Sequence, residues 1–161
     1  MSRRTAGMRV GAALLVAWAG FACLDPADRR PGLRLTGEVV EEPVEDWSFT
    51  DAHREIFVET RPPWRLPHSV TIVATSLDGE LYVHARNPEE KRWVGHVARD
   101  PRVRLEIGGK IYERRLERVE DPARQEAIYR DFAAKYGWEL QPPARRPPLR
   151  YFHVVPREEE G

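Results

Sequence analysis

Hydrophobic and polar residues alternate in several short stretches, which is the pattern of β-strands with one buried face. The stretch "RVRLEI" at residues 102–107 alternates without a break. The stretch "SVTIVATS" at residues 69–76 also alternates, and it continues past Asp78-Gly79 into "ELYVHAR" at residues 80–86. Because Asp-Gly is typical of a two-residue turn, these two stretches predict a β-hairpin. Further strands are predicted at residues 33–40, 54–61, 110–119 and 149–155.

Two short helices are predicted between the strands. Asn87-Pro88 favours a helix start, because Asn is a frequent N-cap and Pro suits the first turn, and Asp100-Pro101 ends that helix. Asp121-Pro122 begins a second helix in the same way, and Gly137 suits its C-terminal end. The order β-β-β-β-α-β-β-α-β predicts a mainly β (α+β) protein, a small antiparallel barrel with two peripheral helices. The apolar face of the second helix recurs every four residues, at Ile128, Phe132 and Tyr136.

The charged stretch "KIYERRLERV" at residues 110–119 is the most polar of the predicted strands. We interpret it as a strand at the edge of the sheet, or as one with a solvated face. The proline-rich stretch "QPPARRPP" at residues 141–148 is interpreted as an extended linker to the last strand.

The first 23 residues predict an export signal. Three arginines precede an apolar segment, Val10–Ala22, which is short for a membrane span of about 20 residues. Cys23 follows this segment, where bacterial lipoprotein signals place an acylated cysteine. The alternatives are simple cleavage after Ala22 or Ala19, an uncleaved anchor, or a buried N-terminal helix.

The sequence is therefore divided into four parts. We predict a signal or lipoprotein leader at residues 1–23, a tether at 24–32, a barrel domain at 33–156 and an acidic tail at 157–161. The predicted location is the bacterial cell envelope, as a membrane-anchored lipoprotein or otherwise as a periplasmic or secreted protein.

Composition narrows the possible functions. The 161 residues include 26 basic and 26 acidic side chains, so no net field attracts nucleic acid, and no nucleic-acid partner is predicted. Cys23 is the only cysteine, which excludes an internal disulfide and a multi-cysteine metal site. The five histidines show no short ligand spacing, so no metal site is predicted, and each is interpreted as structural or exposed. No catalytic motif stands out, and the catalytic residues stay unassigned.

Three features occur in a familiar order. "DGELYV" at residues 78–83 precedes a short helix with Lys91 and Trp93, and "RDPRVRLEIGGKIYE" follows at residues 99–113. Together they resemble the flavin-binding split-barrel superfamily, which includes the pyridoxamine 5'-phosphate oxidase-like and the deazaflavin-dependent nitroreductase-like proteins. The resemblance covers residues 54–137. It implies a six-stranded antiparallel split β-barrel, a homodimer, and FMN or a deazaflavin in a groove at the dimer interface.

The same resemblance implies candidate cofactor-binding residues. In that superfamily a basic residue at the start of the short helix binds the cofactor phosphate, and Lys91 matches this position. Arg86 precedes the helix, and Arg65 or His68 lies where the superfamily often has a basic residue entering the third strand. Arg and Lys suit a phosphate because they donate charge-assisted hydrogen bonds. Trp93 is a candidate for stacking on the flavin ring, or else a core residue.

We therefore expect an exported flavin-binding protein that acts as an oxidoreductase on a small molecule. The alternative is a cofactor-free split barrel that serves as a binding or structural module of the cell envelope. Haem binding through a histidine is a further, minor alternative.

Overall fold

The computed structural model describes residues 31–64 and 66–157. The predicted leader with Cys23, most of the tether, the candidate residue Arg65 and most of the acidic tail lie outside the described residues. No helix in the described part of the chain is long and apolar enough to cross a membrane.

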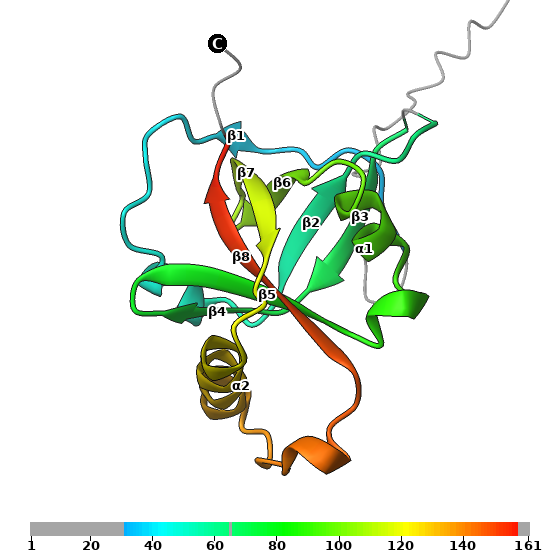
Figure 1. The fold of residues 1–161 in the computed structure, drawn as a ribbon. Coiled ribbons are helices and arrows are strands. Elements are labelled where there is room, and N and C mark those ends of the chain that lie inside the picture. Colours follow the sequence, from blue (N-terminus) through cyan, green and yellow to red (C-terminus); the bar gives the residue numbers. More distant parts are fainter. Residues whose placement is uncertain (1–30, 65, 158–161) are drawn as a thin grey trace, which may run out of the picture.

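One curled antiparallel sheet forms the body of the molecule (Figure 1). Its strands are β1 (Glu38–Val39), β2 (Ile56–Thr60), β3 (His68–Ile72), β4 (Ala74–Leu77), β5 (Glu80–Arg86), β6 (Arg102–Ile107), β7 (Lys110–Arg118) and β8 (Leu149–Pro156). The order across the sheet is β3-β2-β6-β7-β8-β5-β4, and the short β1 pairs with β7 in parallel. The expected fold class, a mainly β antiparallel split barrel, is confirmed.

The predicted strand at residues 69–76 is in fact two strands. Val73 separates β3 from β4, and the two strands pair with different partners, β3 with β2 and β4 with β5. The two edges of the sheet are therefore consecutive in the chain, which curls the sheet into a split barrel. Alternation continues through Val73, so the sequence pattern alone does not reveal this change of partner. The sheet path has seven strands as a result, where the resemblance implies six.

The first predicted helix is shorter than expected. A 3-10 turn, η2 (Pro88–Glu90), precedes α1 (Arg92–Val97), and Lys91 between them has extended backbone angles of φ −97° and ψ 111°. Asn87 adopts left-handed angles, with φ 51°, and its side chain does not cap the turn. The prediction that Asn87-Pro88 begins one continuous helix is therefore wrong. Two further 3-10 turns are η1 (Ser48–Ala52) and η3 (Pro143–Arg145).

The second predicted helix is confirmed as α2 (Pro122–Tyr136). The Asp121 side chain accepts hydrogen bonds from the backbone N–H groups of Ala123 and Arg124, which satisfies two donors at the helix start. Gly137 closes the helix with φ 69°, a conformation that costs glycine little. The predicted hairpin turn is also present, with φ 57° at Asp78 and 80° at Gly79.

Apolar side chains form two clusters. One fills the barrel and includes Val58, Val83 and Leu105, all with no exposed surface, together with Trp93 of α1. The other lies between the sheet and α2. Its buried members are Tyr82, Ile128, Tyr129, Phe132 and Tyr151. Burying these side chains is the main favourable contribution to folding, at about 25 cal/mol per Å² of apolar surface.

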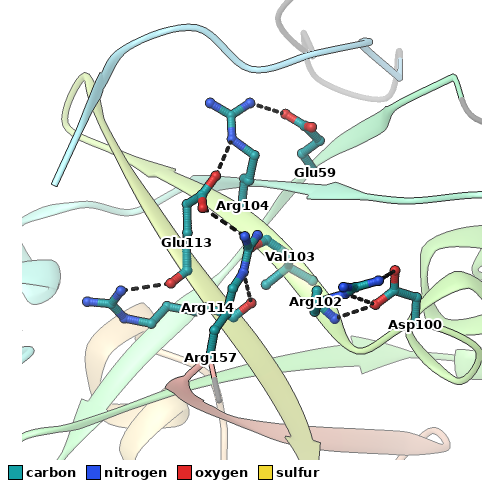
Figure 2. Close-up of polar contacts among 8 residues, drawn as sticks. All are labelled: Glu59, Asp100, Arg102, Val103, Arg104, Glu113, Arg114 and Arg157. Atoms are coloured by element: carbon teal, nitrogen blue, oxygen red, sulfur yellow. Dashed lines mark hydrogen bonds and ion pairs between the residues drawn. The ribbon is translucent and has the colours of Figure 1, made fainter. Parts of the chain in front are cut away.

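The polar strand β7 lies in the middle of the sheet, paired with both β6 and β8, so its interpretation as an edge strand is wrong. Its polar side chains join a network with neighbouring strands, shown in Figure 2. Arg104 donates to Glu59 at 2.7 Å, and both side chains are buried. Arg157 donates to Glu113 at 2.7 Å. We call Glu59 and Arg104 the buried charge network; Glu113, which is 40% exposed, and Arg157 extend it toward the surface.

Candidate functional site

A cleft of about 830 Å³ opens where β3 and β5 separate. The β4–β5 ladder ends with Ala74 opposite Val83, and beyond that pair the two strands diverge toward other partners, β3 toward β2 and β5 toward β8. We call this divergence of the two strands the fork. The three residues before Ala74 and the three residues after Val83 all line the cleft: Thr71, Ile72, Val73, His84, Ala85 and Arg86. Continuing the ladder register would have set Val73 against His84, Ile72 against Ala85 and Thr71 against Arg86.

Three of the predicted cofactor-binding residues meet at this cleft. His68 comes from the start of β3, Arg86 from the end of β5, and Lys91 from the junction between η2 and α1. His68 is distant in sequence from Arg86 and Lys91, and all three line the same opening. Figure 1 shows the elements that carry them, β3, β5 and α1. The fourth candidate at the cleft is Trp93.

Trp93 belongs mainly to the barrel core. It is buried, and its ring lies 5.5 Å from that of Phe152 between centroids. It also lines the cleft, so one part of this side chain forms the apolar wall of the opening. The alternative of a core residue is therefore confirmed, and stacking on a flavin ring stays a prediction.

The basic side chains of the cleft have no protein partners. Arg86, Lys91 and Arg92 are exposed, and within the described residues none of their side chains forms a hydrogen bond or an ion pair. Sequence reasoning did not single out Arg92, although it directly follows Lys91. Two carboxylates, Glu55 and Glu90, also line the cleft and partly offset this positive charge.

Two polar side chains in the cleft wall are buried without a partner. The hydroxyl of Thr71 and both ring nitrogens of His84 have no hydrogen bond within the described part of the chain. The His84 ring is enclosed by aromatic rings, with centroid distances of 4.6 Å to Phe132 and 5.6 Å to Trp138. Burial lowers the pKa of His84 to about 4, so the ring is neutral at pH 7. An unsatisfied buried polar group costs roughly 1–3 kcal/mol, so each of these groups is a candidate position for a water molecule or a ligand atom.

The size and the lining of the cleft suit a small molecule with an anionic group. Its volume lies within the range of about 300–1,000 Å³ that is usual for small-molecule sites. Among the described residues, no group of three or more His, Cys, Asp or Glu side chains is arranged to hold a metal ion. The free cations can hold an anionic group, and the apolar wall of Val70, Ile72 and Trp93 can cover a planar ring.

Comparison with solved structures identifies the fold. The chain is similar to a candidate pyridoxamine 5'-phosphate oxidase from Listeria innocua, at 18% identity and a TM-score of 0.52, over 68% of this chain and 88% of the other. It is similar to a candidate 5-nitroimidazole antibiotic resistance protein from Bacteroides thetaiotaomicron, at 13% identity and a TM-score of 0.56, over 80% and 88%. A FAD-binding protein from Mesorhizobium loti matches at 15% identity and a TM-score of 0.50, over 68% and 85%.

At these identities the matches establish the shared fold and nothing finer. No model of a known protein family matches the sequence, and no curated protein does. The resemblance that the sequence suggested is therefore confirmed as a split-barrel fold, and it came from only a few local patterns, "DGELYV" and "RDPRVRLEIGGKIYE" among them.

Proposed function

We propose that the cleft between β3 and β5 binds a flavin-type cofactor, FMN or a deazaflavin, and that the protein is an oxidoreductase acting on a small molecule. The observation that carries this proposal is the set of three unpaired cations, Arg86, Lys91 and Arg92, around one cleft. The fold supports it, because similar structures are named as a FAD-binding protein and a candidate pyridoxamine 5'-phosphate oxidase.

The free cations suit the phosphate end of such a cofactor. Most arginines elsewhere in the described chain are held by carboxylates, as Arg124 is by Asp78 and Glu80. Cations without partners keep their hydrogen-bond donors for a ligand, and Arg can bind a phosphate through two parallel bonds. Arg86 and Lys91 therefore bind and orient the phosphate in this proposal.

The fork between β3 and β5 suits the flavin ring, at the other end of the cofactor from its phosphate. Apolar residues on one side and the unpartnered Thr71 hydroxyl on the other offer a surface with few, placed polar groups. When bound, a flavin supplies the hydride or electron transfer. The chain supplies binding, orientation and exclusion of water from the ring.

The carboxylates of the cleft favour a second candidate. Glu55 and Glu90 line the same opening and repel a phosphate. The alternative is therefore a cofactor-free split barrel that binds another small molecule or serves as a structural module.

Titration with FMN, followed by quenching of flavin fluorescence, distinguishes the two candidates. We expect saturable binding by the wild-type protein. Arg86→Ala and Lys91→Ala should each weaken it about tenfold or more, since a hydrogen bond to a charged group contributes roughly 1.5–3 kcal/mol. The matched control is the double variant Lys110→Ala/Arg145→Ala, which removes two exposed, unpaired cations outside the cleft.

Two results would reject the cofactor proposal. A wild-type protein that binds neither FMN nor a deazaflavin would favour the cofactor-free module. Equal weakening in the cleft variants and in the Lys110→Ala/Arg145→Ala control would mean that general charge, and not the cleft, attracts the flavin. A Soret absorption band in the purified protein would instead favour haem.

The proposal also includes export, attachment to the membrane through acylated Cys23, and a homodimer. The sequence pattern of residues 1–23 supports the first two, and the resemblance supports the third. Replacing Cys23 by Ser should move the protein from the membrane fraction to the soluble fraction, and unchanged partitioning would reject acylation. Light scattering on the purified protein tests the homodimer.

A further inference from the structure

Two histidines form a pair beside the cleft, and one of them, His68, belongs to its lining. His68 begins β3 and lines the cleft, and His96 lies in the last turn of α1. Their rings are perpendicular, with 5.3 Å between centroids. Trp64 packs edge-on against the His96 ring at 5.6 Å. The pair is thus assembled from a strand and a helix, and the loop residue Trp64 packs against it.

Thr60 determines which nitrogen of His96 takes up a proton. Its hydroxyl lies 3.1 Å from the carbonyl oxygen of His68 and 2.9 Å from Nδ1 of His96. A carbonyl cannot donate, so the hydroxyl donates to it and accepts from Nδ1–H. Protonation of His96 therefore occurs at Nε2. Within the described chain, neither this atom nor the ring nitrogens of His68 form a hydrogen bond or ion pair.

Positive groups surround the pair. Burial, and then the charge of Arg92, lower the pKa of His68. Burial, followed by His68, Arg99 and Arg92, lowers the pKa of His96. Within the described residues no carboxylate opposes these effects, so the pair is neutral near pH 7 and resists a positive charge unless an anion compensates it. The other charged side chains lining the adjoining cleft are Glu55, Arg86, Glu90 and Lys91.

We propose that His68, His96 and Arg92 form an anion subsite beside the cleft, and that a bound anion brings a proton from solvent into the histidine pair. The inference deepens the proposed function and rests on the cleft being an anion-binding site. The ligand chemistry is a phosphate or carboxylate group, carried either by the cofactor or by the substrate.

Because anion binding and proton uptake are coupled, the affinity for the anion depends on pH in a definite direction. A nearby anion stabilises an imidazolium, so the pKa of the pair is higher with the anion bound than without it. Affinity therefore rises as the pH falls from the bound-state pKa toward the lower pKa of the free pair, and it levels off below that value. The rise is up to about tenfold per pH unit for each proton taken up.

Sulfate is the probe, because it keeps two negative charges over the pH range where a phosphate ester titrates, near pH 6. Sodium sulfate is titrated into the full-length protein at pH 5.5, 6.5 and 7.5, while NMR follows the histidine ring resonances. We expect tighter binding at lower pH, and resonances of His68 and His96 that report a higher pKa with sulfate than without. The resonances of His53, outside the cleft, should not respond.

Two variants separate proton uptake from simple attraction. His96→Asn keeps a donor toward Thr60 but cannot titrate, and His68→Gln removes the other imidazole. Both should flatten the pH dependence of sulfate binding, whereas His53→Asn should keep the wild-type slope. An unchanged slope in both variants, or no sulfate binding at any pH, would overturn the subsite.

FMN titration at pH 7.5 keeps the two proposals distinguishable. Proton-coupled sulfate binding in a protein that does not bind FMN would reject the cofactor and leave the subsite standing. FMN binding together with sulfate binding that does not change with pH would reject the subsite alone.

Discussion

The molecule holds its charges in two opposite ways. In the buried charge network, Glu59 and Arg104 are 5% and 7% exposed and lie 2.7 Å apart (Figure 2). At the cleft, Arg86, Lys91 and Arg92 are exposed and have no partner within the described residues. In the first region the two charges are paired inside the protein, although Nε of Arg104 makes only an ion-pair contact, to Glu113 at 3.4 Å, and no hydrogen bond within the described residues. The second region keeps its donors available.

The difference indicates what each region does. Glu59 also accepts the backbone N–H of Leu35 at 2.8 Å, and Arg104 donates to the Leu35 carbonyl at 3.0 Å, so the pair fixes the chain segment before β1 onto the barrel. Such a pair is interpreted as structural, because its two charges contact each other and the backbone of Leu35 inside the protein. The exposed cations of the cleft make no such contacts within the described residues, and this is why we assign ligand binding to them.

Removing one partner of the buried pair should have the largest effect on stability. In Glu59→Gln the buried Arg104 loses its buried counter-charge and keeps only Glu113, which lies 3.4 Å away and is 40% exposed. The free energy of unfolding should therefore fall by about 3 kcal/mol, the lower end of the range for breaking a buried ion pair. Urea denaturation measures this change. Glu117→Gln is the matched control, because Glu117 pairs with Arg115 at 2.7 Å but is 47% exposed, and its loss should cost at most about 1 kcal/mol. Equal losses in the two variants would contradict the structural role of the buried pair.

The unpartnered His84 should make stability depend on pH. A histidine in the unfolded chain titrates near 6.5, whereas the pKa of His84 in the fold is about 4. Between these values the unfolded state binds more protons, so its contribution is complete above pH 6.5 and is lost as the pH falls to 4, by about 3 kcal/mol in all. His84→Phe fits the same aromatic surroundings and cannot titrate.

Urea denaturation at pH 7.5 and at pH 5.0 tests this prediction. The stability lost between the two pH values should be about 2 kcal/mol smaller in His84→Phe than in the wild type. The remaining loss would come from other groups, such as His68 and His96, whose pKa values burial also lowers. Equal losses in the variant and the wild type would show that the His84 ring is not held neutral by burial.

Local sequence signals predicted the local structure well. The Asp78-Gly79 hairpin and the Asp121 and Gly137 ends of α2 are present because each depends on a few adjacent residues. The break at Lys91 was missed, since Asn87-Pro88 favours a helix start but here forms only a 3-10 turn. The change of partner at Val73 was missed as well, because strand pairing is decided by distant strands.

The candidate site could be predicted only in part. The resemblance named Arg86, Lys91 and His68, and these line one cleft. Thr71 and His84 could not be found, because their burial without partners depends on the fork between β3 and β5. The ion pair of Glu59 and Arg104 could not be predicted from the sequence either, since the two residues are 45 positions apart in the chain.

The smallest predicted effect concerns a carboxylate of the cleft. Glu90 lines the opening, is exposed and has no partner within the described chain, so it should repel a bound phosphate. Glu90→Gln should tighten FMN binding roughly two- to fivefold, in keeping with the 0.5–1 kcal/mol typical of exposed charge interactions, and salt should shrink the gain. Glu139→Gln, which removes an exposed, unpaired carboxylate outside the cleft, is the control. Equal FMN affinity in the two variants would mean that the phosphate does not bind beside Glu90, and that the free cations act elsewhere along the cleft.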